Sequence, residues 1–130
     1  MLRRHFILVA ALASLLGFGV ARAATVANFD QASFAAAQQA GKPILVHINA
    51  SWCPTCAQQR PIIEKLSADP AFKNLMIFKV DFDSQKDVVK AMGVQMQSTM
   101  IVFHGSTEKG RATGDTNPDS IRALLAKSEG

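Results

Sequence analysis

Short apolar runs, separated by turn and capping residues, set the first expectations for this chain. Residues 44–48 are apolar except for one histidine, which is typical of a buried strand. Residues 75–82 begin with an apolar run and end in alternating apolar and polar positions, and residues 99–103 form another short run rich in β-branched and aromatic residues. These three segments are therefore predicted as strands.

Capping residues delimit helices between and after these strands. The helices are predicted over residues 31–40, 54–68 and 84–92 and from residue 118 onward. Asp30 and Asn117 are the expected N-caps of the first and last helices, and Gly41 and Gly93 end the first and third. Pro61 lies inside the second helix, where its missing amide hydrogen should produce a kink.

The order of these elements predicts an α/β fold. Residues 109–113 add an edge strand antiparallel to residues 99–103, so the order is helix, strand, helix, strand, helix, strand, strand, helix. This alternation favours a central mixed sheet of about four to five strands with helices on both faces. In such folds, chemistry is placed at the carboxyl ends of the strands.

Residues 1–23 have the composition of a secretory signal peptide. Two arginines precede an apolar stretch at residues 6–20, and residues 21–23 supply an Ala-Arg-Ala cleavage pattern. The stretch is shorter than the roughly 20 residues that a bilayer span needs. We therefore expect a single domain over residues 24–130, exported to a bacterial periplasm, with an uncleaved anchor or twin-arginine export as the alternatives.

The charge of the chain argues against a nucleic-acid partner. The whole sequence has 14 basic and 10 acidic residues, but three of the arginines fall within residues 1–23. Residues 24–130 hold 11 basic against 10 acidic residues, a net charge of +1, so the domain lacks a basic excess. We expect it to act as a monomer.

The chain has two cysteines, Cys53 and Cys56, within the sequence Trp-Cys-Pro-Thr-Cys at residues 52–56. The motif joins the strand at 44–48 to the helix at 54–68, which places Cys53 at the helix N-cap. Free amides and the positive helix end stabilise a thiolate there. Cys53 is therefore predicted to be the exposed nucleophile and Cys56, one turn further, the less exposed resolving thiol.

The sequence resembles the thioredoxin family over essentially all of residues 24–130. The W-C-x-x-C element after a buried strand carries the resemblance, and Pro61 stands where thioredoxins have their helix-kinking proline. Gly93-Val94 and then residues 98–105 are similar to the family's passage from its third helix into the next strand and turn. The resemblance implies a thioredoxin-like fold and a thiol–disulfide oxidoreductase that acts on protein thiols and disulfides without a bound cofactor.

The same resemblance implies that Trp52, Gln97 and Ser98 contact the substrate. In thioredoxins the position of Ser98 holds a proline after a cis peptide bond, and the residue before it, here Gln97, pairs its backbone with extended substrates. A non-proline cis bond costs about 2.5–4 kcal/mol. We therefore predict a trans bond before Ser98 and a locally remodelled loop.

His47 is a second departure from the family, because thioredoxins have a buried acid six residues before the first cysteine. An imidazole titrates near neutral pH, so His47 could relay a proton for Cys56. The alternative is a hydrogen-bonded core histidine without a kinetic role. Both interpretations are open at the level of the sequence.

The direction of electron flow does not follow from Pro54-Thr55, the pair between the cysteines. It is neither the Gly-Pro typical of reducing thioredoxins nor the Pro-His of strong periplasmic oxidases. We expect a reductant of protein disulfides. In an oxidising compartment the disulfide of such a protein must be reduced again after each reaction, and a membrane-bound electron donor is the expected partner.

Two other function classes compete with this prediction. A copper-handling or other metal-binding module would use Cys53 and Cys56 with nearby histidines or with the three methionines Met92, Met96 and Met100. A zinc site would need four ligands, more than the motif and nearby histidines readily supply, so no metal site is predicted. The third possibility is an interaction module with idle cysteines.

Overall fold

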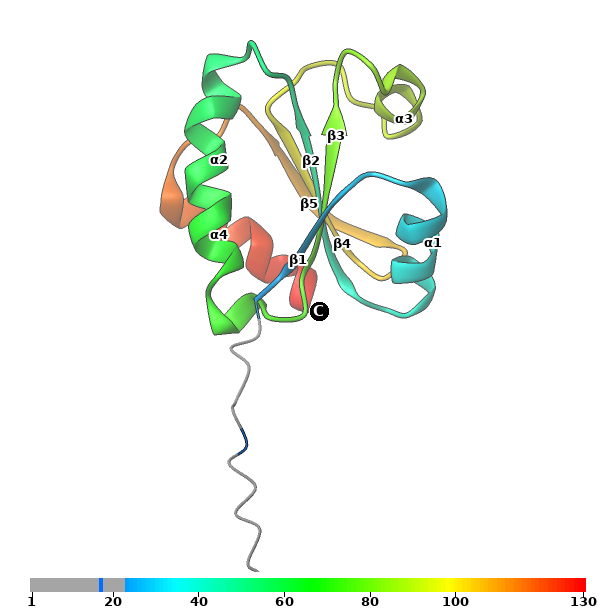
Figure 1. Cartoon of the computed structure of the whole chain (residues 1–130), viewed down its shortest axis with the longest axis vertical. Coiled ribbons are helices and arrows are strands. Elements are labelled where there is room, and N and C mark those ends of the chain that lie inside the picture. Colours follow the sequence, from blue (N-terminus) through cyan, green and yellow to red (C-terminus); the bar gives the residue numbers. More distant parts are fainter. Residues whose placement is uncertain (1–16, 18–22) are drawn as a thin grey trace, which may run out of the picture.

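The structure is organised around a five-stranded sheet with two helices on each face (Figure 1). It is a computed structural model that describes residue 17 and residues 23–130. The strands are β1 (Thr25–Asn28), β2 (Pro43–Asn49), β3 (Met76–Asp81), β4 (Thr99–His104) and β5 (Thr107–Thr113). The helices are α1 (Gln31–Gln39), α2 (Pro54–Ser67), α3 (Lys86–Ala91) and α4 (Pro118–Ala126), with 3₁₀ turns η1 (Pro70–Phe72) and η2 (Lys127–Glu129).

The sheet is mixed, with the strand order β1-β3-β2-β4-β5. The strands β1, β3 and β2 run parallel, and β4 and β5 continue the sheet antiparallel. The central strand β2 pairs Val46 with Phe78 of β3 on one side and with Ile101 of β4 on the other. The predicted α/β fold with a mixed sheet and helices on both faces is therefore confirmed.

The strand β1 was not predicted from the sequence. Its four residues Thr-Val-Ala-Asn are exposed or half-buried and too short to show a hydrophobic alternation. The strand exists because its backbone pairs in parallel with β3 at the edge of the sheet, from Thr25 opposite Met76 to Asn28 opposite Lys79. Pairing across the fold, rather than local sequence preference, makes this segment a strand.

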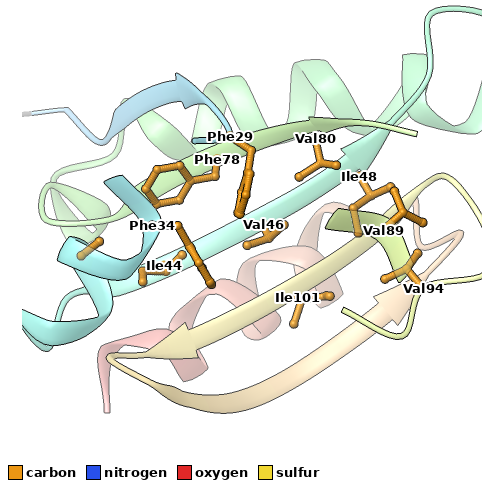
Figure 2. Close-up of a cluster of buried hydrophobic side chains, with 11 residues drawn as sticks. Phe29, Phe34, Ile44, Val46, Ile48, Phe78, Val80, Val89, Val94 and Ile101 are labelled. Atoms are coloured by element: carbon orange, nitrogen blue, oxygen red, sulfur yellow. The ribbon is translucent and has the colours of Figure 1, made fainter. Parts of the chain in front are cut away.

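Two hydrophobic cores lie on opposite faces of the sheet. The core beneath α1 and α3 contains Ile44, Val46 and Ile48 of β2, and Phe34 of α1 packs there against the Phe78 ring (Figure 2). Leu45 points to the other face, where α2 and α4 cover the second core. Because side chains alternate along a strand, His47 shares the face of Leu45, beneath α2.

The predicted signal peptide at residues 1–23 lies outside the described residues, apart from residues 17 and 23. Within the described part of the chain, no helix has the length and apolar character that a membrane crossing requires. The folded part shown in Figure 1 runs from β1 to the 3₁₀ turn η2.

Candidate active site at the start of α2

Cys53 is the N-cap of α2, as the sequence predicts. Its backbone is extended, with φ −81° and ψ 114°, and Pro54 supplies the first helical residue. The Cys53 Sγ accepts a hydrogen bond from the Cys56 backbone N–H at 3.1 Å. The first turn of α2 contains no acidic residue that would oppose a negative charge on this sulfur. The helix end is therefore built to stabilise a Cys53 thiolate once the pair is reduced.

Cys53 and Cys56 form a disulfide, with 5.3 Å between their Cα atoms. In this oxidised form Cys53 is 2% exposed and Cys56 is fully buried, so the prediction of an exposed Cys53 is wrong for this state. Both cysteines pack with Ala50, and the half-buried Phe82 covers the cluster. The strand-to-helix turn folds the disulfide inward against these side chains, which the sequence pattern does not reveal.

Trp52 lies next to the disulfide as an exposed side chain, with 58% of its surface accessible. Its indole Nε1–H donates a hydrogen bond of 2.7 Å to the Asp83 carboxylate, which follows the end of β3. This bond holds a large apolar ring at the surface in a fixed position beside the cysteines. Sequence reasoning singled out Trp52 but missed Asp83, because the two residues are 31 positions apart.

His47 is buried on β2 and joins a polar network inside the apolar core. Its Nε2 atom lies 3.0 Å from the Oε1 of Gln59 on α2. The Gln59 Nε2 in turn donates to the carbonyl oxygens of Ser98, at 3.0 Å, and of Asp115, at 2.9 Å. One buried amide thus ties together the central strand, the helix that carries the cysteines, and two loops.

The pKa of His47 is lowered from its ordinary value of 6.5. Burial is the main cause, because it disfavours the charged imidazolium, and the hydrogen bond with Gln59 acts in the opposite direction. The cations Arg60 and Lys79 lower the pKa of His47 further. The imidazole is therefore neutral at pH 7.

Ser98 occupies the loop between α3 and β4, as the resemblance implies. No peptide bond among the described residues is cis, so the predicted trans bond before Ser98 is confirmed. Ser98 has a positive φ of 62°, a left-handed conformation unusual for a residue other than glycine. Its carbonyl accepts from Gln59 and from the Gly114 N–H, each at 3.0 Å, which holds the loop in place. Gln97, beside it, is half-buried.

The three methionines of the competing metal hypothesis lie in different parts of the structure. Met92 packs against the core under α1 and α3, whereas Met100 belongs to the core on the opposite face. Met96 is 56% exposed at the surface. Within residues 23–130, no three side chains of the types His, Cys, Asp and Glu cluster as metal ligands would. The three methionines therefore do not belong to one buried cluster.

Gln59 is the residue of the site that sequence reasoning missed. A signal was present, since the buried stripe of α2 consists of Cys56, Gln59, Ile63 and Leu66, at helical spacing. A glutamine on such a stripe needs polar partners inside the protein. The positions of those partners, 12 to 56 residues away, could not be read from the chain alone.

Comparisons with known proteins agree with this geometry. The family model described as Thioredoxin matches residues 23–127. The Thioredoxin H-type of Chlamydomonas reinhardtii is 33% identical over 96 residues, which cover 74% of this chain and 83% of that protein. The Protein disulfide-isomerase erp38 of Neurospora crassa is 32% identical over 106 residues, 79% of this chain but 28% of that longer protein.

Solved structures are similar as well. The crystal structure of Trxlp from Edwardsiella tarda EIB202 superposes with a TM-score of 0.76 at 38% sequence identity. The match covers 78% of this chain and 98% of that one.

The buried neutral His47 predicts a specific dependence of stability on pH. In the unfolded chain the imidazole binds a proton as the pH falls through about 6.5, whereas the folded protein resists protonation. The free energy of unfolding should therefore fall by up to about 1.4 kcal/mol per pH unit between pH 6.5 and the lower folded pKa. His47→Gln should remove this slope, as measured by urea denaturation at pH 5 to 7.

The carboxylates with lowered pKa values provide a control for this measurement. Asp30, Asp69, Asp81 and Glu108 have lowered pKa values, so their contribution to stability is lost only below about pH 4.5. The loss of stability below about pH 4.5 should therefore be the same in the unaltered protein and in His47→Gln. An unchanged slope between pH 5 and 6.5 in His47→Gln would contradict the assignment to His47.

Proposed function

Because the chain belongs to the thioredoxin family, a family of thiol–disulfide oxidoreductases, we propose that it is an exported member that reduces disulfides in protein partners. The observation that carries the proposal is the position of Cys53 at the N-cap of α2, with its sulfur bonded to the Cys56 amide. This position favours the thiolate of Cys53, which is the nucleophilic form.

The proposed reaction has two steps. The Cys53 thiolate attacks one sulfur of the partner's disulfide, which forms a mixed disulfide and releases the partner's other sulfur as a thiolate. Cys56 then loses its proton and attacks the Cys53 sulfur, which closes the disulfide seen here and expels the second partner thiolate. The dithiol is oxidised by two electrons, and the partner's disulfide is reduced by the same two.

The partner would dock on the surface beside the disulfide. Trp52 offers an exposed apolar ring that Asp83 holds in place. Met96, in the loop between α3 and β4, adds an exposed and conformationally adaptable side chain. We propose that Gln97 and Ser98 form the backbone contact with an extended segment of the partner. A monomer suffices for this reaction, because both cysteines lie in one chain.

Export is proposed from the composition of residues 1–23, whose basic start, apolar stretch and small residues fit a cleaved secretory signal. Mass spectrometry of the protein purified from a periplasmic fraction should give a chain that begins at Ala24. A full-length chain confined to the cytoplasm would contradict export.

The two-step reaction predicts different outcomes for the two cysteines. In Cys56→Ser, Cys53 should still attack, but the mixed disulfide should accumulate, and multiple-turnover reduction of insulin should fall on the order of a hundredfold or more. In the control Cys53→Ser, no mixed disulfide should form. Nonreducing gels and mass spectrometry distinguish these outcomes, and equal trapping by both variants would contradict the assigned roles.

The direction of electron flow is tested by redox equilibrium with glutathione. A reductant should have a potential nearer to about −270 mV, as in reducing thioredoxins, than to about −120 mV, as in strong oxidants. The membrane-bound donor proposed to recharge the protein must then be more reducing still. A reduction potential near about −120 mV would contradict the proposed reducing direction. It would still be compatible with thiol–disulfide exchange.

A further inference from the structure

The helix α3 ends in a turn that is completed by a residue from a distant strand. Gly93 has a positive φ of 66°, which leads the chain out of the helix. The amides of Gly93 and Val94 donate back to carbonyls of α3, at 3.0 Å each. The carbonyl oxygen of Met92, at the C-cap, accepts a hydrogen bond of 3.1 Å from the Nη2 of Arg111 on β5. The side chain of Arg111 therefore satisfies a carbonyl that the helix cannot satisfy itself.

Arg111 reaches α3 from the edge strand of the sheet. On β5 it lies opposite Ile101, which belongs to the core beneath α1 and α3, so Arg111 is on the face that α3 covers. Its Nε and Nη2 atoms donate to the Glu108 carboxylate at 3.0 and 2.6 Å. These hydrogen bonds lower the pKa of Glu108, so the pair is charged at neutral pH. A bidentate pair of this kind fixes the plane of the guanidinium.

The Met92 carbonyl begins the loop that joins α3 to β4, here called the docking loop (residues 92–98). The other end of the docking loop is held by the two hydrogen bonds to the Ser98 carbonyl and by Thr99, whose Oγ1 donates to the Met96 carbonyl at 2.8 Å. Between these ends the loop borders a cavity of about 340 Å³, lined by Met96 on one side and by Thr99 and Arg111 on the other. Because this side of the loop faces open space, its position depends on the hydrogen bonds at its two ends.

We propose that Arg111 is a positioning residue for partner binding, which fixes the start of the docking loop from the edge of the sheet. The inference rests on the proposed docking of partners at Gln97 and Ser98, in the same loop. The pair of Arg111 and Glu108 is partly exposed, so without the guanidinium water can bond to the Met92 carbonyl and the fold is retained. The loop is then freer, and a bound partner must restrict it, which weakens binding.

The first measurement is hydrogen exchange in the reduced protein, which requires no activity. In Arg111→Met the last turn of α3 should open more often, so the Gly93 and Val94 amides should exchange about threefold faster or more. The amides of the central strand β2 should exchange as in the unaltered protein. Unchanged exchange at Gly93 and Val94 would overturn the inference, and an equal increase in β2 would show a general loss of stability and would also contradict it.

The second measurement separates partner binding from the chemistry of the dithiol. In Arg111→Met the KM for insulin should rise about threefold or more, with kcat changed by less than about twofold. The small molecule bis(2-hydroxyethyl) disulfide needs no docking loop, so the rate of its reduction should stay within about twofold of the unaltered protein. An unchanged KM for insulin, or an equal loss with the small disulfide, would contradict a role in docking.

These two measurements also distinguish the inference from the proposed function. If the unaltered protein reduces neither insulin nor the small disulfide, the proposed function fails, whereas the hydrogen exchange still tests whether Arg111 fixes the loop. If both disulfides are reduced and Arg111→Met changes neither KM nor exchange, the inference fails and the proposed function stands.

Two further variants separate positioning from a general effect of surface charge. Glu108→Gln keeps the guanidinium but removes its charged partner, so the KM for insulin should rise by a smaller factor than in Arg111→Met. Arg122→Met is the matched control, because Arg122 pairs with Asp69 at 2.8 Å on the opposite face of the sheet, which α4 covers. It should change neither KM nor loop exchange. An equal rise in KM in Arg122→Met, or no rise in Glu108→Gln, would contradict the inference.

Discussion

The hydrogen bond from the Cys56 amide to the Cys53 sulfur is the interaction on which the chemistry of this protein depends. It forms because the buried strand β2 ends just before the helix α2, and Pro54 sets the first turn. The helix start then offers amide hydrogens to one sulfur while the second lies 5.3 Å away at the Cα atoms. The strand β2 that leads into this junction pairs with β3 on one side and with β4 on the other.

The polar network beneath α2 is a second constraint, and it is built without a buried charge. Ionised groups are costly in an apolar core, and the pKa of His47 is lowered accordingly. Gln59 completes the network with three neutral contacts, so the core stays uncharged while the helix remains tied to the loop at Ser98.

The sequence was sufficient to predict the elements that carry the motif, because β2 and α2 have strong local signals in their apolar run, proline and cysteines. It was insufficient for β1, whose four largely exposed residues become a strand only through pairing with β3. The burial of Cys53 and the contacts of Gln59 and Asp83 likewise depend on residues distant in the chain. Long-range contacts of this kind leave little trace in local composition.

The most direct test of the account is the rate at which the reduced protein is alkylated by iodoacetamide as a function of pH. Mass spectrometry can assign the modification to Cys53 or Cys56. We predict that Cys53 reacts first and reaches half its maximal rate below about pH 7.5, as a thiolate at a helix start should. Half-maximal reaction near the ordinary thiol value of about 8.5, or faster modification of Cys56, would contradict the account.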